Sequence, residues 1–328
     1  KLIVCFLPLG HIVKKKRTEA GRMKRKIWTA IVVGLLFPYI VTLAIGEPAI
    51  TGHEIREKTN SGRRILLDRE QGGYVDLEDY LPGVVARQIP VQFEPEVLKA
   101  QAILARTYIR KQMAGETEIA ESALDLDFFE EEQLKTLWGT DKFVEYYKKI
   151  ESAVEETRGM VITWNGQLID ALFCRASSGK TRDGDGYHPY LASADSKRDV
   201  EAEGFLQIVT WEKKEFASLL SSIPEGETIS EDMVPGCIQV VSRDASGYIE
   251  EIQIGSTIHS GDTVQYALGL QSPDFFIEEY QGSVRAVCSG IGHGYGMSQY
   301  GAERKAKEGW TAQDILEYYF KDIVLISE

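Results

Sequence analysis

The chain has 328 residues, of which 43% are hydrophobic and 27% are charged, a composition that excludes disordered and collagen-like proteins. The formal net charge of −13 means that the chain lacks the excess of Lys and Arg with which nucleic-acid-binding proteins neutralise phosphates. The charge is unevenly distributed, because residues 1–26 hold nine Lys or Arg and one acid, a net +8 that leaves −21 for the remainder. A short basic end on a long acidic body is typical of a membrane-oriented protein, and no nucleic-acid partner is expected.

Residues 27–46 form an uncharged run of twenty residues, IWTAIVVGLLFPYIVTLAIG, directly after the basic triplet 24–26. As a helix, this run is long enough to cross a bilayer. Because positive residues stay on the cytoplasmic side, the sequence predicts a single-pass protein of the cell membrane whose C-terminal body is extracytoplasmic. Two alternatives remain: a signal peptide cleaved at Ala44-Ile45-Gly46, which also exports the body, and a buried helix of a soluble protein.

These features divide the chain into parts. Residues 1–26 are predicted to be a basic cytoplasmic tail, although Met23, just before the basic triplet, is a plausible true start. Residues 27–46 are the predicted anchor, and the polar residues 47–73 are the predicted linker. The exported domain is expected to span residues 74–325.

The first half of this domain carries helix signals. Pro95 suits the first position of a helix, where its missing N–H costs nothing, and the helix is predicted to run to about residue 113. Val97, Leu104 and Tyr108 fall on one face of that helix, which should therefore pack into a core. The acidic residues 115–157 are predicted to be mostly helical.

The remainder of the domain mixes strands and helices. Asn165-Gly166 joins two apolar runs and tolerates the positive φ of a type I′ turn, so residues 160–173 are predicted to form a hairpin. Residues 205–230 are predicted to be mostly helical, and short strands are predicted within 237–288. A helix should follow Gly296, and another should begin near Trp310, where Thr311 and Asp314 form a capping box. Without a regular βαβ period, the sequence predicts an α+β fold with short antiparallel strands and hairpins.

The four cysteines, Cys5, Cys174, Cys237 and Cys288, do not form a disulfide framework, because they are widely spaced. A pair between Cys237 and Cys288 has no support from the sequence. Each cysteine is better interpreted as a small buried hydrophobic residue.

Two short motifs carry chemistry. The string SSGKT (177–181) is similar to a phosphate-binding loop, but that loop needs a glycine at position 174, which is Cys. The string GHGYGMSQYGA (292–302) alternates glycines around His293 and Tyr295, and a helix is expected to follow. Such a turn exposes backbone N–H groups, so it is a candidate binding site for an anion or a hydroxyl.

Three blocks of the chain resemble the signature blocks of the stage II sporulation protein D / LytB (SpoIID/LytB) family. They are VDLEDYLPGVVARQIPVQFEPEVLKAQAILARTYIR (75–110), SSGKT (177–181) and GHGYGMSQYGAERKAKEGWTAQDILEYYF (292–320). The resemblance covers residues 74–325 and implies a membrane-anchored cell-wall protein that takes part in engulfment during sporulation. Some members are peptidoglycan lytic transglycosylases, and LytB-like members are amidase enhancers.

The resemblance also implies a substrate and partners. The substrate is a peptidoglycan glycan strand already stripped of its stem peptides, cleaved between N-acetylmuramic acid and N-acetylglucosamine. The partners are a sporulation amidase/endopeptidase, which removes the stem peptides, and a membrane partner of the engulfment machinery. Cleavage needs one carboxylic acid that protonates the glycosidic oxygen and then takes the proton of the sugar's 6-hydroxyl, giving a 1,6-anhydro end. A two-carboxylate hydrolase would use water instead.

The chain departs from the family pattern at Gln88, since the family has a catalytic Glu just before the Ile-Pro of the first block. A carboxamide can hydrogen-bond a sugar, but it cannot donate and recover a proton. Three interpretations follow. The protein is a glycan-binding partner of an amidase, a neighbouring acid among Glu94, Glu96 and Asp79 substitutes for Glu, or Gln88 is an engineered trap. The first is favoured, and an active transglycosylase with a substitute acid is the main alternative.

Further residues are assigned from the blocks. Arg106 is expected either to contact substrate or to support the core by pairing with a carboxylate. Because some family members hold zinc near the second block, Cys174 and His188 are candidate zinc ligands, although a structural zinc site needs four. A zinc-dependent hydrolase is a third, less favoured function. The residues expected to bind substrate are Arg106, Ser177, Ser178, Lys180, Thr181, His293, Tyr295, Ser298, Gln299 and Tyr300.

Overall fold

The computed structural model describes residues 60–68 and 73–328, which belong to one compact unit. Among the helices that it describes, none is both long enough and apolar enough to cross a bilayer. The predictions for the N-terminal part fall largely outside the described residues: the tail 1–26, the start at Met23, the anchor 27–46 and most of the linker 47–73.

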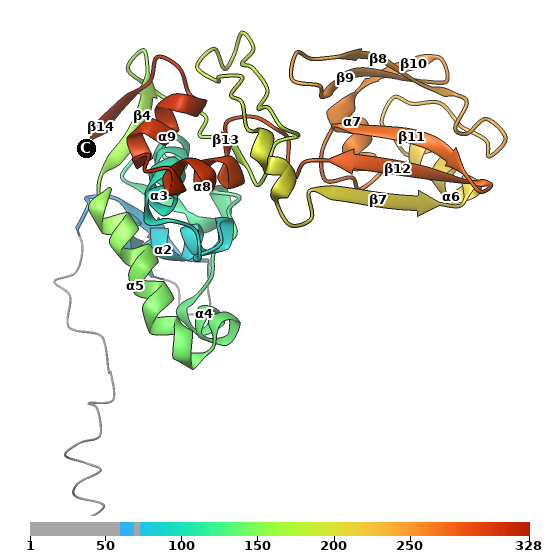
Figure 1. Cartoon of the computed structure of the whole chain (residues 1–328). Coiled ribbons are helices and arrows are strands. Elements are labelled where there is room, and N and C mark those ends of the chain that lie inside the picture. The colour runs from blue at the N-terminus through green and yellow to red at the C-terminus, as the bar shows by residue number, and fades with distance from the viewer. Residues whose placement is uncertain (1–59, 69–72) are drawn as a thin grey trace, which may run out of the picture. The chain divides into compact units, whose positions relative to one another are not determined.

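The first hydrophobic core combines the early and late parts of the chain (Figure 1). Its helices are α2 (Leu77–Gln88), α3 (Pro95–Gln112), α4 (Glu131–Trp138), α5 (Thr140–Glu156), α8 (Gln299–Lys307) and α9 (Ala312–Tyr319). Three small sheets have the strand orders β2-β1-β3, β14-β4-β5 and β13-β6. Their strands are β1 (Arg64–Leu66), β2 (Tyr74–Asp76), β3 (Glu118–Ala120), β4 (Met160–Trp164), β5 (Gln167–Leu168), β6 (Phe173–Cys174), β13 (Met297–Ser298) and β14 (Val324–Ser327).

Local signals set the starts of the helices. The Asp76 carboxylate accepts a hydrogen bond from the backbone N–H of Glu78 and so caps α2. Pro95 is the first residue of α3, and Thr311 with Asp314 forms a capping box at the start of α9, so both predictions are confirmed.

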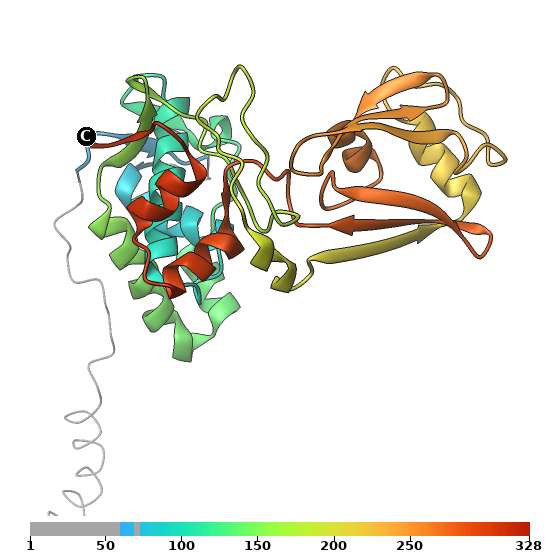
Figure 2. The same cartoon turned by 45° about the horizontal axis from the view of Figure 1, so that its top comes forward.

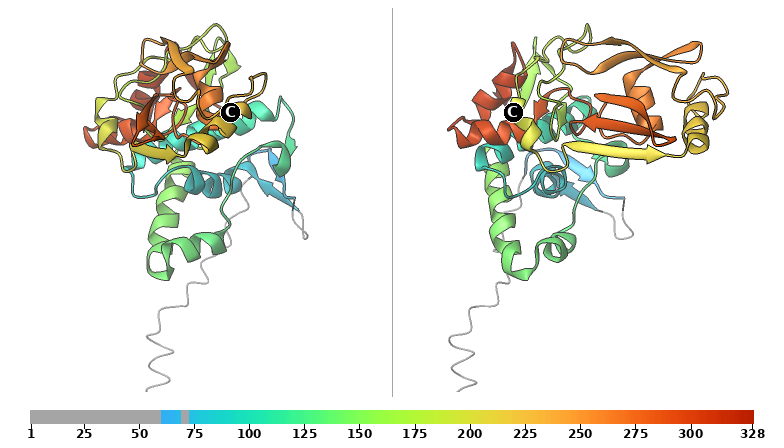
Figure 3. Two further views of the ribbon diagram at one scale, coloured as in Figure 1. Left: turned by 90° about the vertical axis from the view of Figure 1, so that its right-hand side faces the viewer. Right: turned by 45° about the vertical axis from the view of Figure 1, so that its right-hand side comes forward.

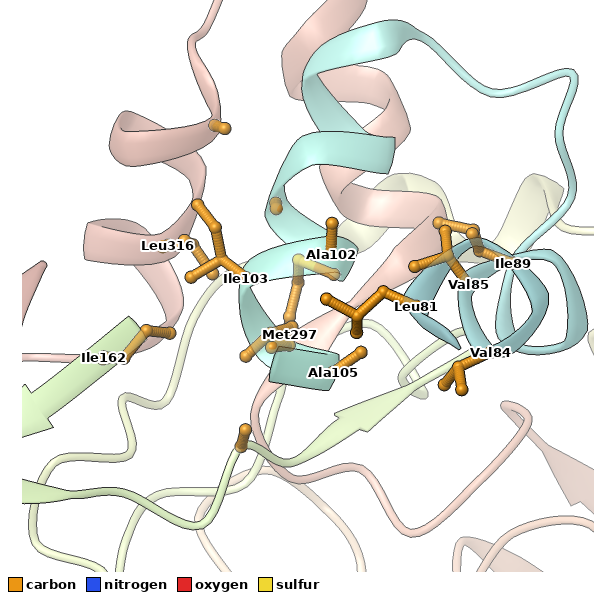
Figure 4. Close-up of a cluster of buried hydrophobic side chains, with 14 of the residues drawn as sticks. Leu81, Val84, Val85, Ile89, Ala102, Ile103, Ala105, Ile162, Met297 and Leu316 are labelled. Carbon is orange, nitrogen blue, oxygen red and sulfur yellow. The ribbon is translucent and has the colours of Figure 1, made fainter. Parts of the chain in front are cut away.

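The centre of this core lies where α2 and α3 meet the third sequence block. Figure 4 shows Leu81 and Val85 of α2 and Ile103 and Ala105 of α3 around Met297 of β13. All of these side chains are at most 2% exposed. The core therefore fixes the third block against the helix pair, and both helices carry candidate site residues.

Helices α4 and α5 form a helical hairpin joined at Gly139, and α5 packs against α2 and α3 (Figure 3). The prediction of a mostly helical segment over residues 115–157 is confirmed for this hairpin and wrong for its first part. Residues 118–120 form strand β3, which pairs with β1, and residues 121–123 form a 3-10 turn. The strand was missed because its partner β1 lies 54 residues away, and the periodicity of the local sequence does not indicate such a distant pairing.

The second hydrophobic core lies between two three-stranded sheets, β11-β12-β7 and β10-β9-β8, with α6 and α7 packed against them (Figure 2). The chain enters along β7 and returns along β12, which pair antiparallel. The three described cysteines are free, and Cys288 is buried in this core. The elements are β7 (Leu206–Trp211), α6 (Lys213–Ser221), β8 (Ile238–Arg243), β9 (Ile249–Ile254), β10 (Thr257–Ser260), α7 (Gly261–Ala267), β11 (Phe275–Tyr280) and β12 (Ser283–Ser289).

Mixed helices and short sheets confirm the α+β class, but the expectation of antiparallel strands alone is wrong, since β1 pairs with β3 and β6 with β13 in parallel. The turn Asn165-Gly166 has φ of +49° and +77° and joins β4 to β5, so the hairpin prediction is also confirmed. The helical prediction for residues 205–230 is confirmed only for α6 and is otherwise wrong: residues 222–230 form turns and irregular structure, and residues 206–211 form β7. These residues alternate between exposed and more buried positions, a strand pattern, and they pair with β12 more than 70 residues later.

Candidate functional site

Gln88 is the last residue of α2, which ends there because Ile89, the residue before Pro90, adopts an extended conformation. Its side chain is half-buried and lines an open cavity of about 670 Å³. The other residues lining the cavity are Asp68, Arg87, Glu121, Ser122, Asp125, Leu126 and Asp127. The position from which the family resemblance expects an acid is therefore accessible to a ligand.

A chain of three amides holds Gln88. Gln299 Nε2 donates to the backbone carbonyl of Gln88 at 2.9 Å and to Gln101 Oε1 at 3.0 Å, and Gln101 Nε2 donates to Gln88 Oε1 at 2.7 Å. Gln101 and Gln299 are 0% and 2% exposed, so these bonds are shielded from water. The first and third sequence blocks thus meet at Gln88.

The backbone carbonyl fixes the direction of this chain. A carbonyl can only accept, so Gln299 must present its NH₂ group to it, and the same group then donates to the Gln101 oxygen. Gln101 in turn must donate to Gln88, whose oxygen faces inward. Among the described residues, the Gln88 NH₂ group has no hydrogen-bond partner. It is therefore available as a donor at the cavity.

The structure places the three proposed substitute acids away from this cavity. The Glu96 carboxylate binds Lys99 and caps α9 through the backbone N–H of Ala312, and Glu94 is the residue preceding α3. Asp79 lies on the exposed side of the first turn of α2. None of the three is among the residues that line the cavity with Gln88. They were the nearest acids in sequence, but helix geometry directs them elsewhere.

Other carboxylates line the cavity instead. Asp127 pairs with Arg87 at 2.8 Å, and Asp68 accepts a hydrogen bond from the backbone N–H of Ser122 at 2.6 Å. Asp125 is exposed and makes no hydrogen bond or ion pair that the structure assigns within residues 60–68 and 73–328. The sequence offered only a weak signal for these acids, because the stretch 116–132 also fits a solvated acidic surface.

A buried carboxylate joins the second and third blocks. Asp199 is 0% exposed and lies in the 3-10 turn Lys197–Glu201. Its Oδ2 accepts hydrogen bonds from Ser177 N at 2.7 Å, Ser177 Oγ at 2.6 Å and Ser298 Oγ at 2.7 Å. Burial raises the pKa of Asp199 to about 6, although the bonds from Ser177 and Ser298 oppose the shift.

The raised pKa of Asp199 has a measurable effect on stability. A carboxyl group whose folded pKa lies above its unfolded value binds more protons in the folded state, so stability falls as pH rises from about 4 to about 6. With a shift from 3.8 to about 6, the expected penalty at pH 7 is about 3 kcal/mol. Urea unfolding of the wild type and Asp199→Asn should therefore give a difference in unfolding free energy that changes by about 2–3 kcal/mol between pH 4 and pH 7, because part of the penalty is already present at pH 4. A constant difference across that range would contradict the shift.

His293 lies in a different part of the third block from Gln299. Its Nδ1 accepts a hydrogen bond from the backbone N–H of Tyr295, and burial lowers its pKa despite the opposing charge of Asp262. The Arg182 guanidinium stacks 4.3 Å from the centre of the Tyr295 ring and pairs with Asp244 and Asp262. This cluster connects the third block to the second core. His293 and Tyr295 are not among the residues that line the cavity beside Gln88.

Glycines in the third block adopt backbone conformations that other residues would strain. Gly296 has φ +72°, and a Cβ atom there would lie 1.9 Å from the Leu172 carbonyl oxygen. Gly309 also has positive φ, but its surroundings are open. Gly309→Ala is expected to lose about 1–2 kcal/mol of unfolding free energy, and Gly296→Ala about 2–5 kcal/mol, because steric overlap adds to backbone strain. Equal losses in urea unfolding would show that the overlap is relieved without cost.

The other predicted substrate-binding residues divide into enclosed and accessible groups. Arg106 is 1% exposed and pairs with Glu78, so it occupies the core-support position that the sequence left as one of two options. Ser177, Thr181, Ser298 and Gln299 are also buried, bonded to protein groups. The accessible or half-buried members are Ser178, Lys180, His293, Tyr295 and Tyr300.

The donors proposed for zinc do not fit that ion. Burial raises the pKa of the Cys174 thiol, which disfavours the thiolate that a metal needs. His188 directs Nδ1 and Nε2 to the carboxylates of Asp185 and Asp170, at 3.0 and 3.3 Å. Within the described part of the chain, no group of three or more His, Cys, Asp or Glu side chains is arranged to hold a metal.

Two residues of the site were missed from the sequence. Gln101 lies on the same helical face as Val97 and Leu104, and a polar residue within an apolar stripe was the available signal. Asp199 sits in a polar loop, where no local pattern distinguishes a buried acid from an exposed one.

Comparisons with known proteins agree with the sequence blocks. A family model described as Stage II sporulation protein matches residues 70–164. The chain is 32% identical over 261 residues to "Stage II sporulation protein D" of Bacillus amyloliquefaciens, covering 76% of this chain and 74% of that protein. It is 33% identical to the protein of the same name from Bacillus subtilis (strain 168), covering 75% and 73%. It is 24% identical to "Amidase enhancer" of B. subtilis (strain 168), covering 75% of this chain and 40% of that protein.

Proposed function

The chain belongs to the stage II sporulation protein D family, and on that premise we propose that it binds peptidoglycan glycan strands at the cavity beside Gln88. A cell-wall role in sporulation follows from the family and from the likeness to an amidase enhancer. In this role it assists septal wall remodelling during engulfment and contributes little transglycosylase activity of its own.

The orientation of the Gln88 carboxamide carries this proposal. Gln101 holds its oxygen inward and is itself oriented by Gln299, which leaves the Gln88 NH₂ group as a donor at the cavity. Sugar hydroxyl, ring and glycosidic oxygens accept hydrogen bonds, so this donor suits a glycan. A carboxamide does not titrate near neutral pH and cannot supply the proton cycle of transglycosylation. Binding without cleavage is the function that this geometry supports best.

An active lytic transglycosylase is the second candidate, because carboxylates do line the cavity. Asp125 and Asp127 come from the loop before α4 and share the cavity with Gln88. Either could replace the missing acid, in place of the acids nearest to Gln88 in sequence. Such an enzyme would leave 1,6-anhydro ends on the glycan and lose activity when its aspartate is replaced by asparagine.

Partners and location extend the proposal. A sporulation amidase or endopeptidase that strips stem peptides would prepare the strands that this cavity binds, and the amidase-enhancer relative supports such a pairing. A membrane partner of the engulfment machinery and an anchor at residues 27–46 would hold the domain at the outer face of the cell membrane.

The binding test compares the full-length wild type with Gln88→Met, which keeps a long unbranched side chain but removes the NH₂ donor. Loss of one hydrogen bond should weaken binding to stem-free glycan strands by about three- to tenfold. Gln313→Met is the matched control, because Gln313 is an exposed glutamine on α9 that bonds to Glu317. No binding by the wild type, or equal binding by Gln88→Met, would contradict the proposal.

A further inference from the structure

Asp199 occupies a position that connects two of the three sequence blocks to the site. One carboxylate oxygen, Oδ2, receives three hydrogen bonds, two from Ser177 and one from Ser298. The other oxygen, Oδ1, is buried and has no hydrogen-bond partner among the described residues. A carboxylate in this state is costly to bury, so its presence here points to a role beyond filling space.

The path from Asp199 to Gln88 is short and continuous. Ser298 is the N-cap of α8, and its Oγ also accepts a hydrogen bond from the backbone N–H of Gly301. The next residue, Gln299, begins α8 and donates to Gln88 and Gln101. Moving Ser298 would therefore move the first turn of α8 and the amides bonded to it.

We propose that Asp199 is a positioning residue that ties the serine turn at 177–181 to the start of α8 and so sets the placement of the Gln299–Gln101–Gln88 amide chain. The inference rests on the proposed function only for its link to glycan. The positioning itself is a property of the free protein. An ionised Asp199 accepts all three bonds, whereas protonation weakens its oxygen as an acceptor and loosens the link between the turn and α8.

The charged and titratable groups around Asp199 do not include a cation that pairs with its carboxylate. Cys174 of β6 and Tyr319 of α9 interact with it, and burial raises the pKa of both of these groups. Ser196 contacts Tyr319 through its hydroxyl. On the same 3-10 turn, Arg198 pairs with Glu201, and Glu201 also pairs with Arg304 of α8. Asp199 itself forms no ion pair with a described residue, so its proton responds to pH without a compensating cation.

The first experiment records the side-chain amide NMR signals of Gln88, Gln101 and Gln299 in the full-length protein as a function of pH. In the wild type all three should shift together with a midpoint near pH 6. In Asp199→Asn they should stop titrating. Asp195→Asn removes a nearby exposed carboxylate that pairs with Lys197, and it should titrate like the wild type. A wild type whose glutamine signals are flat, or an Asp199→Asn variant whose signals still titrate, would overturn the proposal.

A second variant tests the path and does not depend on Asp199→Asn folding. Ser298→Ala keeps Asp199 but removes the hydroxyl that connects it to α8. The backbone amide of Ser177 should still titrate in this variant, because it bonds directly to Asp199, while the glutamine signals should lose their pH response. If the glutamine signals titrate unchanged in Ser298→Ala, the coupling does not run through Ser298 and the proposal is wrong.

Binding of stem-free glycan strands then separates the two proposals. Asp199→Asn should weaken binding by about tenfold, and Asp195→Asn should leave it unchanged. A wild type that titrates as expected but does not bind glycan removes the proposed function and leaves the positioning role intact. If the wild type binds glycan and Asp199→Asn binds it with the same affinity, the positioning role is contradicted and the proposed function is not.

Discussion

Gln88→Glu is expected to release 1,6-anhydro ends from stem-free glycan strands about 10²–10⁴-fold faster than the background rate at which the wild type stays, which is the usual contribution of a positioned acid and base. The substituted carboxyl keeps the length of the glutamine side chain. One of its oxygens can accept the hydrogen bond from Gln101, which leaves the other at the cavity in place of the NH₂ group. Mass spectrometry of the reaction products gives the number of anhydro ends formed per protein molecule.

The matched control for this gain of activity is Gln88→Met, which fits the same position without a titratable proton. It should stay at the wild-type rate. If Gln88→Glu folds normally, binds glycan and still produces no more anhydro ends than Gln88→Met, then position 88 is not where the acid of an active relative would act.

Arg106→Met is expected to lower the unfolding free energy by about 3–5 kcal/mol, because it leaves the Glu78 carboxylate buried without its partner. Arg106 binds both oxygens of Glu78 at 2.7 Å, and these side chains are only 1% and 4% exposed. It also donates to the backbone carbonyls of Val154 and Met160. One guanidinium therefore connects α2, α3, α5 and β4.

Two controls separate charge burial from other effects of the Arg106 substitution in urea unfolding. Lys135→Met breaks an exposed pair with Glu131 and should cost less than about 1 kcal/mol. The double variant Glu78→Leu/Arg106→Met removes both buried charges and should recover most of the stability lost by Arg106→Met. A loss below about 1 kcal/mol for Arg106→Met alone would mean that Glu78 is solvated or protonated at no cost. Because α2 carries both Glu78 and Gln88, the same ion pair supports the site.

Local chemistry made several elements predictable from the sequence. Pro95 at the start of α3, the turn Asn165-Gly166 and the capping box of Thr311 and Asp314 each depend on a few neighbouring residues, and the structure contains all of them. The family resemblance added the position of Gln88, which does lie at a cavity.

Long-range contacts account for what could not be predicted. Strand β7 was missed and its residues were predicted to be helical. Its partner strand β12 lies more than 70 positions away, so local sequence does not indicate the pairing. Two of the acids that share the cavity with Gln88, Asp125 and Asp127, come from the loop before α4, whereas sequence distance favoured Glu94, Glu96 and Asp79. Asp199 contacts Ser177 and Ser298 in a tertiary arrangement that includes the pairing of β6 with β13, and no pattern near residue 199 indicates that pairing.

We expect this protein to hold glycan at a site where an amide, Gln88, occupies the position of the family's catalytic acid. Incubation of the full-length wild type with stem-free glycan strands, followed by mass spectrometry of the strand ends, tests it most directly. The expected result is that the protein retains the strands and that 1,6-anhydro ends do not exceed those of a sample without protein. Anhydro ends that accumulate over many turnovers, and that disappear in Asp125→Asn or Asp127→Asn, would contradict the claim and identify an enzyme with a substitute acid.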